Sequence, residues 1–201
     1  MSRRAIQPPT FIDRAELQPH FPTEFHSSAF WEALGRTIGS FGYLEEVLAR
    51  ALFVITGSRH VPGRSPEDDF RVWLQALDKN IRLTLFPLSQ LLENELREDM
   101  RFDYADTLPI FEGLSRLTRI RNVLSHASWR APDEAGKSLL FHVDKTLGSF
   151  EAPVDLEFLE RVQSDTAALC CDVMDLITGI GLPFPGKRNN RLPRSPMRTP
   201  K

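Results

Sequence analysis

The sequence predicts an all-α protein: an up-down bundle of four to five helices with a small β-hairpin before the last helix. Three observations support this fold class. Long stretches carry apolar residues at the spacing of one helix face. Serine, proline and glycine stand where several of these stretches begin or end. The pattern changes only over residues 131–155, where short apolar runs alternate with turn residues.

The first helix is expected over residues 28–57, with Ser28 as its N-cap and Gly57 as the residue that stops it. Its apolar stripe is formed by Phe30, Leu34, Ile38, Phe41, Leu48, Leu52 and Ile55. One acid, Glu45, interrupts this stripe. Because a buried charge without a partner is costly, we expect Glu45 to pair with a cation from another helix.

Three prolines help to place the middle helices. The second helical stretch begins with Ser65 as its N-cap and Pro66 at its first position, and Pro87 is expected to kink or split it. The next helix is expected over about residues 107–128, with Pro109 in its first turn.

A hairpin and a final helix complete the predicted bundle. The runs SLLFHV at 138–143 and TLGSF at 146–150 are expected to form the hairpin, with His142 as a strand residue rather than a ligand. The last helix is expected over about residues 155–180.

Composition divides the chain into a proline-rich arm (1–27), the helical domain (28–182) and a basic tail (183–201) that we expect to be disordered. The tail holds six basic residues and no acid, so the first 182 residues hold 19 basic and 27 acidic residues, a net charge of −8. This balance argues against a broad basic face for nucleic acid.

Cys170 and Cys171 are expected to be buried free thiols. With no secretory signal and no transmembrane run, a cytoplasmic protein without a membrane partner is the simplest interpretation.

The segment RIRNVLSHASW, residues 119–129, places three polar residues on a helix that otherwise fills a core. Arg121, Asn122 and His126 together suit the handling of a phosphate, because arginine offers a charged fork, histidine exchanges protons near neutral pH and asparagine orients an oxygen without titrating. Cleavage of RNA by its own 2′-hydroxyl needs such groups to remove a proton and to stabilise a negatively charged transition state. This route needs no metal, and the sequence has neither a carboxylate cluster nor a metal-binding cysteine spacing, so no cofactor is expected.

The motif, together with an earlier helix that carries Glu45 in its apolar stripe, resembles the HEPN superfamily of α-helical bundles. The signature of that family is an arginine and a histidine separated by four to six residues, and Arg121, Asn122 and His126 match its four-residue form. The resemblance covers residues 28–180. It implies a homodimer in which two motifs form one composite site, with metal-independent endoribonuclease activity that leaves 2′,3′-cyclic phosphate and 5′-hydroxyl ends. It also implies a toxin or phage-defence role, with a cognate antitoxin or defence-system partner.

The spacing between arginine and histidine is not specific by itself, because it occurs elsewhere in the chain. It also fits Arg14 to His20 in the arm, and Arg119 to His126 with a gap of six residues. Tyr104, just before this predicted helix, and Arg119, within it, are further candidates for contacts with RNA.

Several alternatives remain open from the sequence. Arg121 is expected to contact Glu45, either as a paired core arginine or as a site residue that Glu45 supports. Ser125 and Trp129 are near enough to line the site, and Trp129 also suits a core or a dimer interface. His126 could serve as a cation at the helix C-terminus instead of a catalytic group. A non-catalytic helical dimer that binds a nucleotide, RNA or a protein partner is the alternative function.

Overall fold

In the computed structural model of the protein, the described residues form five α-helices, one short 3-10 helix and a two-stranded sheet. Residues 11–59, 63, 65–80, 82–142, 150 and 152–185 are described, apart from the side chains of residues 77 and 78. The α-helices are α1 (Ser28–Gly57), α2 (Pro66–Asn80), α3 (Leu85–Glu98), α4 (Tyr104–His126) and α5 (Leu156–Gly179). The shorter elements are η1 (Arg14–Glu16), β1 (Ser128–Trp129) and β2 (Leu140–Phe141). The predicted all-α class with a small hairpin is confirmed.

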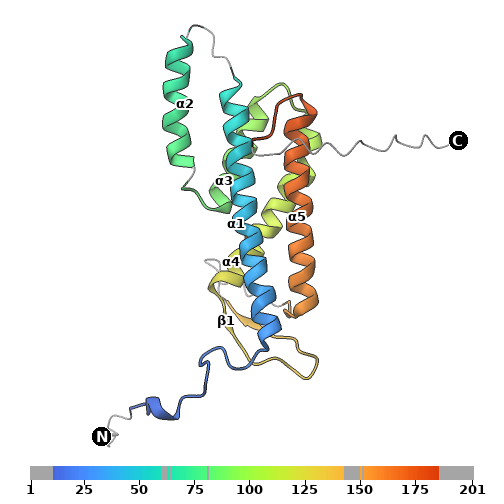
Figure 1. Ribbon diagram of the computed structural model, residues 1–201. Coiled ribbons are helices and arrows are strands. Elements are labelled where there is room, and N and C mark those ends of the chain that lie inside the picture. The colour runs from blue at the N-terminus through green and yellow to red at the C-terminus, as the bar shows by residue number, and fades with distance from the viewer. Residues whose placement is uncertain are drawn as a thin grey trace, which may run out of the picture.

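Helix α1 is the centre of the bundle, because α2, α3, α4 and α5 all pack against it. Helices α1, α3, α4 and α5 run side by side along the molecule, whereas α2 stands apart beside one end of α1 (Figure 1). The middle of α1 is fully buried at Leu44, Val47, Leu48 and Ala51. Each large apolar side chain buried in this way stabilises the fold by about 1.5–3 kcal/mol.

The bounds of α1 match the prediction, but its cap is one residue earlier than expected. The hydroxyl of Ser27, not Ser28, accepts a hydrogen bond from the backbone N–H of Phe30 at 3.3 Å. Gly57 is the last helical residue, and a Cβ at this position would lie 2.9 Å from Nε1 of Trp73 in α2. Glycine therefore also allows α2 to approach the end of α1.

The second predicted helix is divided in two, but before Pro87 rather than at it. Ser65 caps α2 as expected, accepting from the N–H of Asp68 at 3.2 Å, and α2 ends at Asn80. Helix α3 then begins at Leu85, so Pro87 lies in its first turn. A proline there removes an N–H that has no partner within the helix, and it therefore starts a helix instead of kinking one.

Helix α4 begins three residues earlier than predicted and ends two residues earlier. Asp103 caps it by accepting from the N–H of Ala105 at 2.9 Å. Pro109 is consequently the sixth residue of the helix and not part of its first turn, so the carbonyl of Ala105 lacks its usual i+4 donor. The helix ends at His126, because the following residue is extended.

A small hairpin precedes the last helix, as predicted. β2 lies within the expected run 138–143, and it pairs antiparallel with β1, which Ala127 alone separates from the end of α4. The proposed partner at 146–150 lies mostly outside the described residues, as does the basic tail after residue 185. The arm contacts this hairpin through His26, whose Nε2 lies 2.5 Å from Oγ of the buried Ser138. The hairpin and the end of α4 therefore lie together at one end of the bundle.

Helix α5 packs along α1 and carries the two cysteines. Cys170 is buried, and burial raises the pKa of its thiol to about 11. Cys171 is exposed, so the expectation that both thiols are buried is wrong for this residue, which lies on the outer face of α5. Among the described helices, none combines the length and the apolar character that crossing a membrane requires.

Candidate functional site

Arg121 is held where α4 meets α1. Its Nη2 lies 3.7 Å from Oε1 of Glu45, and both side chains are 25% exposed. The predicted contact between these two residues is therefore present. A partly buried pair of this kind restrains the guanidinium while leaving part of it accessible to solvent.

Glu45 has a second contact that connects a third helix. Its Oε1 accepts a hydrogen bond of 2.9 Å from the backbone N–H of Leu85, the first residue of α3. Thr84, which precedes α3, makes no side-chain capping bond, so Glu45 serves as the cap from α1. An acid is favoured at a helix N-terminus. One carboxylate thus joins α1, α3 and α4 behind Arg121.

Asn122 follows Arg121 and is exposed. Its Oδ1 accepts a hydrogen bond of 3.3 Å from Nη1 of Arg121. This assignment of the amide directs its NH₂ group away from the arginine, where it is available as a donor. Asn122 and Arg121 therefore present donors to solvent from adjacent positions.

His126 is the last residue of α4, and its side chain is exposed. Within the part of the chain that the structure describes, it has no hydrogen-bond or ion-pair partner. A capping histidine would bond to the last carbonyls of α4, and the imidazole of His126 makes no such bond. Residues five apart in an α-helix point in directions about 140° apart. Arg121 and His126 of one chain therefore do not face one another.

The other predicted site residues are distributed along α4 and beyond it. Ser125 is exposed beside His126. Trp129 packs edge-on against Phe30, so it belongs to an aromatic cluster between the hairpin and α1. Tyr104 lies at the opposite end of α4, about 33 Å from His126 along the helix axis. Its hydroxyl donates to Glu93 at 2.8 Å, so the structure does not bring Tyr104 to the motif.

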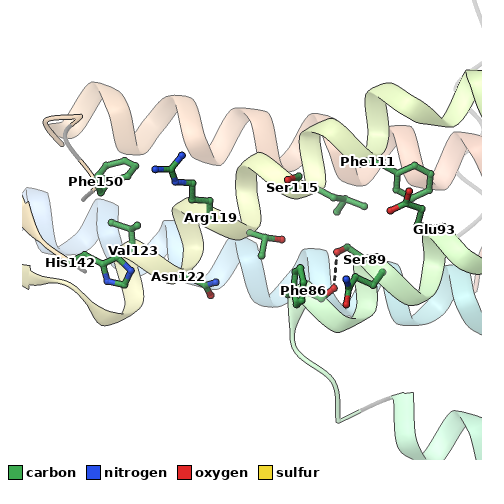
Figure 2. A pocket seen from close by; sticks show the side chains of 13 residues that line it. Phe86, Ser89, Glu93, Phe111, Ser115, Arg119, Asn122, Val123, His142 and Phe150 are labelled. Carbon is green, nitrogen blue, oxygen red and sulfur yellow. Dashed lines mark hydrogen bonds between the residues drawn. The ribbon is translucent and has the colours of Figure 1, made fainter. Parts of the chain in front are cut away.

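Arg119 and Asn122 line a cavity beside the motif (Figure 2). They are three residues apart and share a face of α4. The other arginine pattern, from Arg14 to His20, lies in the exposed arm away from the bundle.

The cavity has a volume of about 420 Å³ and lies between α3, α4 and the chain after β2. Sequence reasoning missed it and assigned His142 to a strand rather than to a binding site, whereas His142 directly follows β2 and lines the cavity. A signal was present in α4, where the polar residues Ser115, Thr118 and Asn122 follow one another at helical spacing. The residues of α3 that line the cavity are distant from α4 in the sequence, so they showed no such pattern.

No family model matches this chain, and neither the curated proteins nor the solved structures contain a significant match to it. Within the described ranges, no three His, Cys, Asp or Glu side chains come together in the manner of a metal-ion site.

Proposed function

We propose that this chain is a metal-independent endoribonuclease of HEPN type, which acts in the cytoplasm as a homodimer with a composite site and serves as a toxin or phage-defence effector. The observation that supports this proposal is the anchored guanidinium of Arg121, which lies between Glu45 and Asn122 and remains partly open to solvent. An arginine that serves only the core would bury its remaining donors.

The proposed chemistry assigns one task to each motif residue. Arg121 neutralises the phosphate as negative charge develops on it. The free NH₂ of Asn122 positions a phosphate oxygen or the attacking 2′-hydroxyl. His126 exchanges the proton of the hydroxyl or of the leaving oxygen. The 2′-oxygen forms a bond to phosphorus as the bond to the 5′-oxygen breaks, which leaves a cyclic phosphate and a 5′-hydroxyl.

A second copy of the chain is part of the proposal, because Arg121 and His126 diverge within one copy. In a dimer with two-fold symmetry, a residue near the axis meets its partner's surface, so the arginine of one copy can face the histidine of the other. The exposed positions of Asn122 and His126 are compatible with a shared cleft.

The second candidate is a non-catalytic dimer that binds a nucleotide, RNA or a protein partner. The net charge of −8 in the first 182 residues favours it, because an acidic body repels the rest of an RNA strand. The two candidates differ in whether the phosphodiester bond is broken.

The test is incubation of the purified protein with labelled single-stranded RNA and with transfer RNA in EDTA. Wild type should cleave and leave cyclic phosphate ends, and Arg121→Ala, Asn122→Ala and His126→Ala should each lose about 100-fold or more in rate. Arg116→Ala is the matched control, because Arg116 is an exposed arginine of the same helix that pairs with Asp165. Cleavage that survives all three motif substitutions would contradict the assignment. A folded wild type that binds RNA without cleaving it would favour the second candidate.

A further inference from the structure

The cavity beside Asn122 contains groups that the proposed cleavage chemistry does not use. Figure 2 shows side chains of α3 and α4 facing this space, with His142 and Phe150 at one end. Its volume of about 420 Å³ lies within the usual range for small-molecule sites, roughly 300–1,000 Å³. What it binds should follow from its polar atoms, its rings and its charges.

The most informative polar atom is the hydroxyl of Thr118. Thr118 lines the cavity, is only 6% exposed and has no hydrogen-bond partner for its Oγ1. A buried hydroxyl without a partner destabilises a protein, which makes Thr118 a candidate contact for a ligand in the cavity. Because a hydroxyl both donates and accepts, a ligand with either kind of group could satisfy Thr118.

The walls of the cavity favour a flat, partly apolar ligand. Phe86 of α3, Phe111 of α4 and Phe150 all line it. Phe86 is 54% exposed, so one of the rings is available to stack on a ligand at the rim. Gln90 adds an amide on the α3 side. Aromatic rings with amide and hydroxyl groups between them are the usual surroundings of an unstacked nucleobase.

The charges are separated along the cavity. Arg119 and His142 lie toward one end, and Glu93 lies at the other (Figure 2). Among the described residues, Arg119 has no ion-pair partner. Glu93 accepts hydrogen bonds from Arg97 at 2.6 Å and from Tyr104 at 2.8 Å, which lower the pKa of its carboxyl and balance its charge. An anionic group of a ligand is therefore favoured at the Arg119 end.

We propose that this cavity binds a single nucleotide, with the base between Phe86, Thr118 and Gln90 and the phosphate toward Arg119 and His142. Asn122 belongs both to the cavity and to the motif. The bound nucleotide is thus the one beside the bond that is cleaved, and the cavity selects its base; this second part rests on the proposed function. The same chemistry would accept a free mononucleotide.

The test is calorimetric titration of the full chain with each of the four ribonucleoside monophosphates, and with a short RNA in the His126→Ala background to prevent cleavage. Thr118→Val keeps the shape of the side chain and removes the hydroxyl. We expect it to weaken binding of the preferred nucleotide about tenfold, with the fold preserved. Thr166→Val is the matched control, because Thr166 of α5 is also buried but already donates to the carbonyl of Val162. Arg119→Gln, at an exposed position, should weaken binding and reduce its salt dependence.

These measurements test the nucleotide cavity separately from the proposed ribonuclease activity. Nucleotide binding that falls in Thr118→Val and not in Thr166→Val supports the cavity, whether or not RNA is cleaved. Tighter binding of the short RNA than of any mononucleotide identifies the strand as the source, whereas equal or weaker binding identifies a free nucleotide. If neither probe binds, or if Thr118→Val and Arg119→Gln both bind as wild type does, the cavity proposal is wrong even where Arg121 and His126 prove essential for cleavage.

Discussion

At the scale of single residues, Glu45 shows which contacts a sequence can predict. An acid in an apolar stripe needs a partner, and so does an arginine in another apolar stripe, so the pair of Glu45 and Arg121 could be expected. The bond from the N–H of Leu85 to Glu45 could not be expected, because it depends on where α3 begins and how α3 lies against α1. The position of a charged residue in an apolar stripe predicts that the residue has a partner. It does not predict every group to which that residue bonds.

Glu45→Ala is expected to lower the free energy of unfolding by about 1–3 kcal/mol, because it removes the cap of α3 and leaves Arg121 without its acid. Urea denaturation measures this change. Glu45→Gln keeps an acceptor for Leu85 and should lose less stability. Cleavage should fall in both variants, since the guanidinium of Arg121 is no longer restrained by a charge.

The neighbouring Glu46 provides the control for this prediction. Glu46 makes an exposed pair with Arg50 one turn along α1. Exposed pairs of this kind contribute little, so Glu46→Ala should change the free energy of unfolding by less than about 0.5 kcal/mol. Equal losses in Glu45→Ala and Glu46→Ala would mean that the contacts of Glu45 with α3 and α4 are not important for stability.

At the scale of elements, the long helices were predictable and the short strands were not. The bounds of α1 match the prediction, and those of α5 differ from it by one residue at each end, because each helix carries an apolar stripe over several turns. β1 has only two residues and no period of its own, so nothing in its sequence showed that it pairs with β2. The predicted positions of Pro87 and Pro109 within their helices are wrong, because the local sequence does not fix the residue at which each helix begins.

The ends of α1 and α3 are joined by a charged network around Asp99. Arg101 donates to Asp99 from its Nη2 at 2.6 Å and to the hydroxyl of Ser58 at 2.8 Å, and Arg59 donates to Asp99 at 3.3 Å. The side chain of Asp99 is almost fully buried. The hydrogen bonds from Arg101 lower the pKa of this carboxyl to about 2 from its ordinary 3.8. The network therefore stabilises the fold only while Asp99 is ionised.

Asp99→Asn is expected to lower the free energy of unfolding by about 2 kcal/mol at neutral pH, which is the free energy equivalent of this pKa shift. Because the pKa of the folded state is below that of the unfolded state, the contribution is complete above about pH 4 and is lost as the pH falls through 2. The difference between wild type and variant should therefore shrink from pH 4 to pH 2 in urea denaturation. Asp103→Asn is the control, because an asparagine caps α4 as well as an aspartate does. A difference that stays constant with pH would contradict the role of the Asp99 charge.

At the scale of the whole molecule, the motif could be found from the sequence and its surroundings could not. Arg121, Asn122 and His126 are neighbours on one helix, so their spacing is visible in the chain. The cavity beside them joins α3, α4 and His142, and these segments are brought together only by folding. The same limit applies to the second copy of the chain, because one sequence does not show which exposed face meets its own copy.

The last prediction tests whether the site is shared between two copies. Heterodimers are isolated with two affinity tags, one copy carrying Arg121→Ala and the other His126→Ala. If the arginine of one copy acts with the histidine of the other, one complete pair remains, and cleavage should reach roughly half the wild-type rate. A heterodimer of wild type with a copy that carries both substitutions should be inactive, because each pair then lacks one member. A site within one chain predicts the opposite for both heterodimers: the first would be inactive and the second would keep half its rate. Arg121 and His126 point about 140° apart on α4. For this reason, we expect the shared arrangement.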